Sequence, residues 1–214
     1  MSEELADGEI APDLRAEFPK LRLVSVAVEA TDGRSSRGAR RRLGLLSARF
    51  RGAQAVVLRQ SPVPQAYRVF FRHIGLDPDV DRPPAEAAAV ARLVAGEFRA
   101  TGRVGDALTI PLVETGVPLW ALDADLVTGG LVLRPAGRDE TLGGGEEPPP
   151  VPEGRLVIAD EQGPAAILFG DLADDRTVSK ATERVLVFSV VVPGVPEIHV
   201  DEALSTCLDL LTEH

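Results

Sequence analysis

The hydrophobic pattern of this chain changes its period near Gly102. Before that point, apolar residues recur at the three-to-four-residue spacing that is typical of amphipathic helices. Beyond it, the chain consists of short Val-, Leu- and Ile-rich segments separated by turn sequences such as TGVP and DEQG. Because helices come first and many short strands follow, the pattern favours an α+β fold with helices mainly from the N-terminal half, rather than a regular βαβ alternation.

These periods predict individual elements. Residues 21–30 alternate, with Val24, Val26 and Val28 on one face, and predict a strand. Residues 53–58 fit either a strand or the end of the helix before them. Helices are expected at residues 13–18, 36–50, 62–74, 83–100 and 201–211, and further strands at residues 107–112, 130–134, 155–160, 165–169 and 184–192. The apolar stripe of the helix at 83–100 is expected to consist of Ala87, Val90, Ala91, Val94 and Phe98.

The amino-acid composition limits how the chain can be divided into domains and which metal or disulfide sites it can contain. Residues 1–12 are acidic and predict a disordered lead, and residues 13–214 predict a single domain with a flexible Gly- and Pro-rich loop at 143–154. The single cysteine, Cys207, excludes an intramolecular disulfide and a cysteine-based zinc site, so we expect no metal and no cofactor. No apolar run has the length of a membrane span and no hydrophobic leader is present, so we expect a cytoplasmic protein without a membrane partner.

Charge is unevenly distributed along the chain. The net charge is −10, yet residues 34–103 carry fourteen basic and five acidic side chains, whereas residues 104–214 carry six basic and twenty acidic ones. Arginine suits bidentate contact with phosphate, although an arginine bias also arises from GC-rich coding sequence. The helix expected at 36–50 carries Arg37, Arg40 and Arg41 on its outer faces, and these three are the candidates for RNA contact. No DNA partner is expected.

Common catalytic motifs are absent from the sequence, which has no P-loop, no G-x-G-x-x-G, no G-x-S-x-G and no H-E-x-x-H. We expect His73, His199 and His214 to be structural or exposed, and their spacing does not indicate a Ser-His-Asp triad. The residues alone therefore lead to a soluble α+β domain with an arginine-rich helical half.

A series of short motifs goes further, because they occur in one order over residues 68–186. In chain order they are Tyr67-Arg68-x-x-Phe71 with Gly75 and Pro78, Arg82-Pro83-Pro84-Ala85-Glu86-Ala87, Gly105-Asp106-Ala107-Leu108-Thr109, Thr115-Gly116-Val117-Pro118 with Ala121-Leu122-Asp123, residues 130–136 with Asp139-Glu140, residues 154–160, and Arg176-Thr177 with residues 182–186. This order resembles the B3/B4 domain, the tRNA-editing domain of the bacterial phenylalanyl-tRNA synthetase β-subunit, and in particular the stand-alone proteins built from that domain alone.

The resemblance implies a three-layer α+β domain with a β-sandwich-like core. It also implies a pocket that hydrolyses the ester of tRNA wrongly loaded with tyrosine, which requires water positioning and oxyanion stabilisation. The family's acidic residue, which reads the extra hydroxyl of the wrong amino acid, falls on Glu140. We therefore expect Glu140 to be the catalytic-site carboxylate; without the resemblance it would be an exposed residue at a strand end. Aminoacylation itself is not expected, because nothing else of a synthetase is present.

The matched positions expected to contact substrate are Gly116, Pro118, Trp120, Arg134, Thr177 and Thr182. Trp120 stands where editing synthetases carry histidine, so general acid–base help from that position is lost. Its indole either stacks on an aromatic group at the pocket mouth or packs in the core. Thr177 and Thr182 either orient water or a ligand, or serve as caps and turns. Thr109 and Asp139 replace the family's Asn and Gly.

Three functions remain open from the sequence. The first is a trans-acting aminoacyl-tRNA deacylase that binds tRNA through the arginine-rich helix. The second is a non-catalytic module that binds an amino acid-like ligand, a nucleotide or RNA and has kept the fold without the editing chemistry. The third is a partner-binding protein with a vestigial pocket. Trp120 favours the second over a standard editing enzyme, and the arginines are compatible with the first two.

Overall fold

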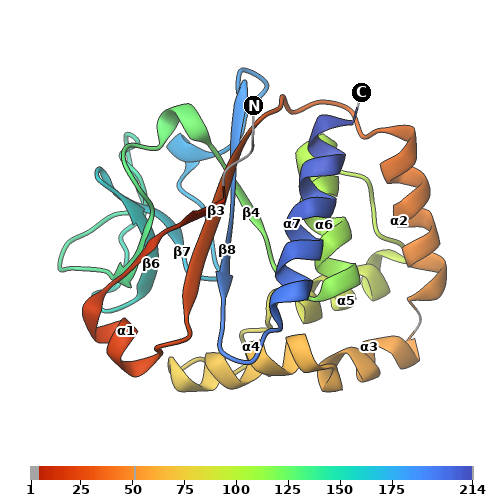
Figure 1. Ribbon diagram of the computed structural model, residues 1–214, viewed down its shortest axis with the longest axis horizontal. Helices are drawn as coiled ribbons and strands as arrows, with labels where there is room; N and C mark the ends of the chain where they lie inside the picture. The colour runs from red at the N-terminus through yellow and green to blue at the C-terminus, as the bar shows by residue number, and fades with distance from the viewer. Residues whose placement is uncertain (1–4, 51, 214) are drawn as a thin grey trace. The chain divides into compact units, whose positions relative to one another are not determined.

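The computed structural model describes residues 5–50 and 52–213, and it confirms the α+β class (Figure 1). The chain forms two compact units, each built from two separate stretches of sequence. Unit 1 contains Met1–Ala30 and Trp120–Val190, and unit 2 contains Thr31–Leu119 and Val191–His214. Residues 13–214, which the sequence analysis treats as one domain, are thus distributed over both units. Among the described residues, no helix combines the length and apolar composition needed to cross a membrane.

Unit 1 holds two four-stranded sheets. The first has the order β1-β3-β8-β4 and the second the order β2-β5-β6-β7. The strands of the first sheet are β1 (Ala6–Asp7), β3 (Arg22–Glu29), β8 (Arg184–Val191) and β4 (Trp120–Asp123). Those of the second are β2 (Glu9–Ile10), β5 (Val132–Pro135), β6 (Leu156–Asp160) and β7 (Gly163–Ile167). Strands β5, β6 and β7 pair antiparallel, as do β4 and β8.

The N-terminal segment joins the two sheets, and this corrects the expectation of a disordered lead for residues 6–10. Strand β1 pairs antiparallel with β3, and β2 pairs parallel with β5. Between them, the Gly8 amide donates to the carbonyl of Leu23, and a Cβ at Gly8 would lie 2.7 Å from the Leu23 side chain. Acidic composition predicted disorder because it does not reveal backbone pairing with distant strands. Residues 1–4 lie outside the described residues.

The core of unit 1 is largely aliphatic. One buried cluster comprises Ala136, Leu142, Val151, Val157, Ala159 and Ala173. Leu142 of this cluster directly precedes the loop at 143–154, which was expected to be flexible, and Val151 lies within the loop. The Leu142 amide donates to Pro149, and Val151 donates to Glu140. The loop therefore has no long regular element, but it is anchored to the core near both ends. After it, the 3-10 helix η2 (Asp174–Arg176) precedes β8.

Unit 2 contains α2 (Arg37–Arg49), α3 (Gly52–Gln60), α4 (Pro62–His73), α5 (Pro84–Ala95), α6 (Arg103–Thr115) and α7 (Glu197–Thr212), whereas the short α1 (Pro12–Glu17) belongs to unit 1. Helices α6 and α7 lie side by side (Figure 1). Ser36 caps α2, since its hydroxyl accepts a hydrogen bond from the Ala39 amide at 2.9 Å. Tyr67, Phe70 and Phe71 of α4 are fully buried and supply most of the aromatic core.

Three expectations of local structure were wrong. Residues 107–112 lie inside α6 and form no strand; the β-branched Thr109 and Ile110 and the internal Pro111 concealed the helix. Strand β4 was not predicted, because its four residues come shortly after the segment TGVP, which was interpreted as a turn. The helix expected at 83–100 ends at Ala95. Four residues of its expected stripe, Ala87, Val90, Ala91 and Val94, are exposed, whereas the fifth, Phe98, is buried beyond the end of α5. The opposite face of α5, with Ala85 and Ala89, is buried. Residues 53–58 lie in α3, a separate helix after α2, so they are neither a strand nor the end of the helix before them.

Candidate functional site

Glu140 lies in unit 1 on the turn that follows β5, directly after Asp139, whose φ of 60° is left-handed. Arg134 of β5 donates from Nη1 to Oε2 at 2.8 Å and from Nη2 to Oε1 at 2.7 Å. The amide of Gly137 also donates to Oε2, at 2.7 Å. The Glu140 side chain is 26% exposed. This arrangement holds the carboxylate in one orientation at the molecular surface.

The hydrogen bonds of Glu140 determine what it can still do. A carboxylate has about four acceptor positions, and Oε2 already accepts two donors while Oε1 accepts one. One acceptor position on Oε1 therefore remains for a ligand. The hydrogen bond from Arg134 lowers the pKa of Glu140, and the backbone donor acts in the same direction. The carboxylate is thus an anionic acceptor at neutral pH, and it is a poor proton donor.

Glu140 borders a hollow of about 510 Å³ whose other lining residues are Arg138, Asp139, Thr141, Pro150, Val151 and Glu153. A second hollow of about 330 Å³ is lined by other residues of the same loop and by residues from 171 to 175. Its lining residues are Leu142, Gly145, Glu146, Glu147, Pro148, Pro149, Asp171, Leu172, Asp174 and Asp175. The second hollow is strongly acidic, so it disfavours phosphate and other anions.

Trp120 begins β4 and packs against two aromatic rings of unit 1. Its ring is stacked on Phe188, with centroids 5.7 Å apart, and tilted against Phe169 at the same distance. Phe169 has a left-handed φ of 57°, which is rare for a bulky residue. These three rings border an apolar crevice that is too narrow to hold a water molecule. Trp120 and Glu140 line different hollows, and no residue is common to the two linings.

Both candidate threonines are engaged in local hydrogen bonds. The buried Thr182 hydroxyl donates to the carboxylate of Asp123 and accepts from the Ser179 amide. Thr177 follows η2 and donates to the Asp174 carbonyl at 2.9 Å. Thr177 also forms an isolated bridge with Leu122 of β4. These contacts are the capping and turn roles that the sequence analysis left open beside ligand contact.

Gly116 and Pro118 lie in unit 2, on the segment that leaves α6. Gly116 ends the helix with φ 80°, and its amide donates to the Leu112 carbonyl. A Cβ at this position would lie 3.0 Å from Cδ of Pro64. Both residues are buried. The glycine is therefore required by the backbone turn and by close packing against α4.

The three arginines expected to contact RNA are exposed on α2, also in unit 2. Arg37, Arg40 and Arg41 form no ion pair with any side chain that the structure describes. On the same helix, Arg42 differs because Glu114 of α6 binds its guanidinium through two hydrogen bonds. Arg37, Arg40 and Arg41 are consequently free to bind an anionic partner from solution, whereas Arg42 helps to hold α2 against α6.

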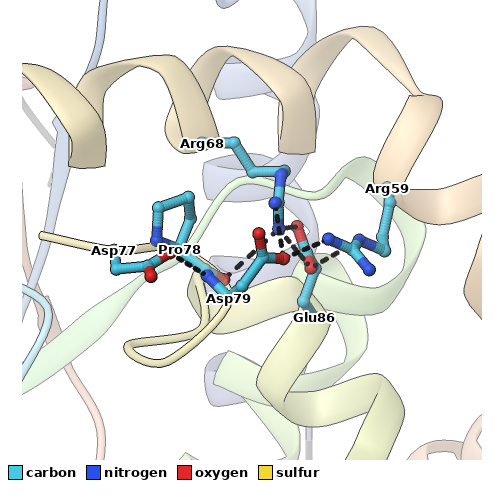
Figure 2. Close-up of polar contacts among 6 residues, drawn as sticks. All are labelled: Arg59, Arg68, Asp77, Pro78, Asp79 and Glu86. Atoms are coloured by element: carbon cyan, nitrogen blue, oxygen red, sulfur yellow. Dashed lines mark hydrogen bonds and ion pairs between the residues drawn. The ribbon is translucent and has the colours of Figure 1, made fainter.

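A network of four charged residues lies within unit 2, with one residue each from α3, α4 and α5 and one from the segment between α4 and α5 (Figure 2). Arg68 of α4 donates from Nη1 to both carboxylate oxygens of Glu86, at 3.1 and 2.9 Å, and from Nη2 to Asp79 at 2.8 Å. Arg59 of α3 pairs with the same two acids. The Arg68 and Glu86 side chains are only 5% and 7% exposed. The hydrogen bond from Arg68 lowers the pKa of Asp79. Sequence reasoning assigned no role to any of the four.

Comparison with known families identifies the chain. The B3/4 domain model matches residues 66–213. The chain belongs to the B3/4 domain family. This is the domain found in the phenylalanyl-tRNA synthetase β-subunit. No curated protein matches the chain. The B3/4 match covers parts of both units and leaves out residues 1–65, so the arginines of α2 lie outside it.

The B3/4 motifs meet in pairs within each unit. Arg68 and Glu86 come from the first two motifs and form the buried ion pair of Figure 2. Arg134 and Glu140 come from one motif and form the bidentate pair described above.

Two further pairs lie in unit 1. In the first pair, the Thr182 hydroxyl donates to Asp123. In the second, Nε of Arg176 lies 3.5 Å from Oδ2 of the buried Asp160. The backbone amides of Thr128 and Gln162 also donate to the Asp160 carboxylate. Many of the polar residues in the B3/4 motifs therefore bind one another and stabilise loops and helix packing.

The described residues contain no group of three or more His, Cys, Asp or Glu side chains that could hold a metal ion. Of the histidines, His73 is exposed on α4, and His199 lies 3.7 Å from Glu202 at the start of α7. His214 lies outside the described residues.

Proposed function

We propose that this B3/4 domain binds aminoacyl-tRNA and hydrolyses the ester of misacylated tRNA in trans. The observation that carries the proposal is the free acceptor position on Oε1 of Glu140, beside a hollow large enough for an amino-acid side chain. Membership of the family supports a tRNA-related role. Such a substrate implies a reaction in the cytoplasm.

Glu140 would act as the group that reads the substrate. Arg134 and Gly137 hold the carboxylate in place, so little reorganisation is needed when a ligand hydroxyl or ammonium donates to Oε1. A ligand without this donor would leave the acceptor unpaired, at a cost of about 1–3 kcal/mol, which is roughly 5- to 150-fold in affinity. Hydrolysis would then require a water directed at the ester carbonyl rather than a protein nucleophile.

The tRNA itself would bind through Arg37, Arg40 and Arg41. The three side chains are exposed on α2 and have no ion-pair partner among the described residues. The acidic hollow of unit 1 disfavours phosphate, so a separate basic surface is needed for a polyanion. Binding through phosphate contacts weakens steeply as the salt concentration rises.

A second candidate function is ligand binding without hydrolysis, and the environment of Trp120 favours it. An indole cannot accept or shuttle a proton, and here it is packed against Phe169 and Phe188. The hydroxyl of Thr182 is committed to Asp123. Neither position offers an acid or base for ester cleavage.

A deacylation assay with a panel of misacylated tRNAs distinguishes the two. Turnover that is lost in Glu140→Gln and retained in Glu153→Gln, an acid from the same hollow, would support the editing function. Filter binding that depends on Glu140 without turnover would support the binding module. Replacing Arg37, Arg40 and Arg41 together by Ala should weaken tRNA binding and reduce its salt dependence. Activity and binding that are both unaffected by Glu140→Gln would remove this residue from the site.

A further inference from the structure

Phe169 holds a backbone conformation that its side chain disfavours. It is the third residue of the turn at 167–170, which the Gly170 amide closes by donating to the Ile167 carbonyl at 2.9 Å. A turn position with positive φ ordinarily holds glycine or asparagine, yet Phe169 has a φ of 57°. Such a conformation persists only where the surrounding structure enforces it. The contacts of the Phe169 ring must therefore offset the strained backbone.

The Phe169 ring packs on the aromatic pair formed by Trp120 and Phe188. Trp120 of β4 and Phe188 of β8 are register partners in the first sheet, and their rings are stacked with an angle of 19° between the planes. The Phe169 ring is tilted by 48° against the indole. Phe188 is buried, whereas Trp120 and Phe169 are half-buried. Trp120 thus contacts one ring in the interior and one ring at the surface.

The crevice beside these three rings is wholly apolar and closed. Its other lining residues are Ile158, Ala166, Ile167, Leu168 and Val190, and it is too narrow to hold a water molecule. A ligand can therefore enter only if a lining side chain moves away. Most of the lining residues belong to hydrogen-bonded strands, whereas Phe169 lies on the turn after β7 and reaches the surface. Phe169 is consequently the lining residue that is best placed to move.

We propose that Phe169 is a lid on a binding site, and that an uncharged aromatic ring takes its place against Trp120. In the closed state the phenyl ring of Phe169 occupies that place, so its chemistry indicates what fits beside the indole. Displacing the ring lets the backbone at residue 169 leave its left-handed conformation. The strain released in the turn offsets part of the cost of opening, and the incoming ring restores the aromatic contact.

The lining of the crevice also determines which rings are excluded. Every lining residue is apolar, so a charged group or a ring with several polar atoms would be buried there without a side-chain partner. A nucleobase and a charged ring therefore fit less well than a benzene-type ring. No residue lines both this crevice and the hollow of Glu140, so binding here does not depend on tRNA hydrolysis.

Fluorine NMR tests the site, because Trp120 is the only tryptophan and 5-fluorotryptophan at this position gives one signal. Phenol should shift this signal saturably. Cyclohexanol, which is aliphatic, and benzylammonium, which is charged, should shift it only at severalfold higher concentrations. A signal that does not respond to phenol would overturn the proposal. An equal response to cyclohexanol would overturn the assignment of an aromatic ligand.

Two substitutions distinguish a lid from a fixed packing contact. Phe169→Gly removes the lid and suits the positive φ. It should lower the dissociation constant for phenol at least about tenfold, because the site no longer has to open before it binds. Gly170→Ala keeps all three rings but places a Cβ 3.0 Å from Cγ2 of Ile167. This Cβ crowds the closed turn, so the variant should lower the dissociation constant severalfold.

Gly145→Ala is the matched control, because Gly145 is exposed in unit 1 and a Cβ there meets no atom within 4 Å. It should leave the phenol affinity unchanged. Circular dichroism establishes that each variant is folded, and Gly170→Ala decides alone if Phe169→Gly does not fold. A phenol affinity that Gly170→Ala leaves at the wild-type value would show that Phe169 is no lid.

Discussion

Arg134 and Glu140 form a two-point ion pair, and the stability of unit 1 should therefore depend on acid pH. The hydrogen bond from Arg134 lowers the pKa of Glu140 below its unfolded value of about 4.3. A depressed pKa means that the charged form stabilises the folded state. This contribution is complete above the unfolded pKa and is lost as the pH falls through the folded pKa.

Comparison of the wild type with Glu140→Gln isolates the effect, since glutamine does not titrate. The free energy of unfolding of the wild type should exceed that of the variant at pH 7. The difference should shrink progressively below about pH 5. Urea denaturation at a series of pH values measures it. A difference that stays constant into the acid range would show that the pair does not stabilise the fold.

The buried pair of Arg68 and Glu86 should tolerate joint replacement better than single replacement. Removing one partner leaves the other charge with a single counter-ion, Asp79 for Arg68 or Arg59 for Glu86. The loss should therefore approach, at most, the about 3–5 kcal/mol that is typical of a broken buried ion pair. Arg68→Met or Glu86→Leu alone should therefore lower the free energy of unfolding strongly, and the double variant should recover much of the loss. Arg72→Ala, an exposed arginine on the same helix, should change stability by less than about 0.5 kcal/mol. Additive losses in the double variant would contradict direct coupling.

Glycine substitutions on two helices should have opposite effects. Gly116→Ala introduces a Cβ at a φ of 80° and 3.0 Å from Pro64, so it should destabilise unit 2 by more than about 1 kcal/mol. Gly44→Ala lies within α2 with open space around the new Cβ, so it should stabilise by up to about 1 kcal/mol. Thermal denaturation compares the two. Equal effects of both substitutions would refute the conformational argument.

Cys207 should resist alkylation in the folded protein. The thiol is fully buried on α7, and burial raises its pKa to about 12. The reactive thiolate is therefore almost absent at pH 8, and iodoacetamide should label Cys207 only in urea. Ser205→Cys, an exposed position on the same helix, should react at once in the native state. Rapid labelling of Cys207 without denaturant would mean that α7 opens readily.

Sequence periodicity predicted the elements whose pattern is both long and undisturbed. Helices α2, α4 and α7 and strands β3, β6 and β8 lie close to the expected ranges. Helix α6 was missed because its β-branched residues favour a strand and Pro111 interrupts the helical pattern. Strands β1 and β2 were missed because such short strands are defined only by their partners. The stripe of α5 was assigned to the core because periodicity identifies an apolar face but not what covers it.

The residues of the candidate site, like the elements of the fold, could be predicted from the sequence only in part. The motifs indicated Glu140, Arg134 and Thr182 as polar positions that matter. They did not reveal that Arg134 binds Glu140 or that Thr182 binds Asp123, since both facts depend on how the loops of unit 1 fold back. The same holds for Arg68 and Glu86, whose motifs were visible and whose pairing was not.

The position of β2 also has a consequence for biosynthesis. Glu9 and Ile10 are translated before their strand partners, Val132 and Leu133, and the helices from α2 to α6 are all translated in between. The second sheet therefore cannot close while the nascent chain is short. The strand β2 must therefore remain without its partner until β5 has emerged.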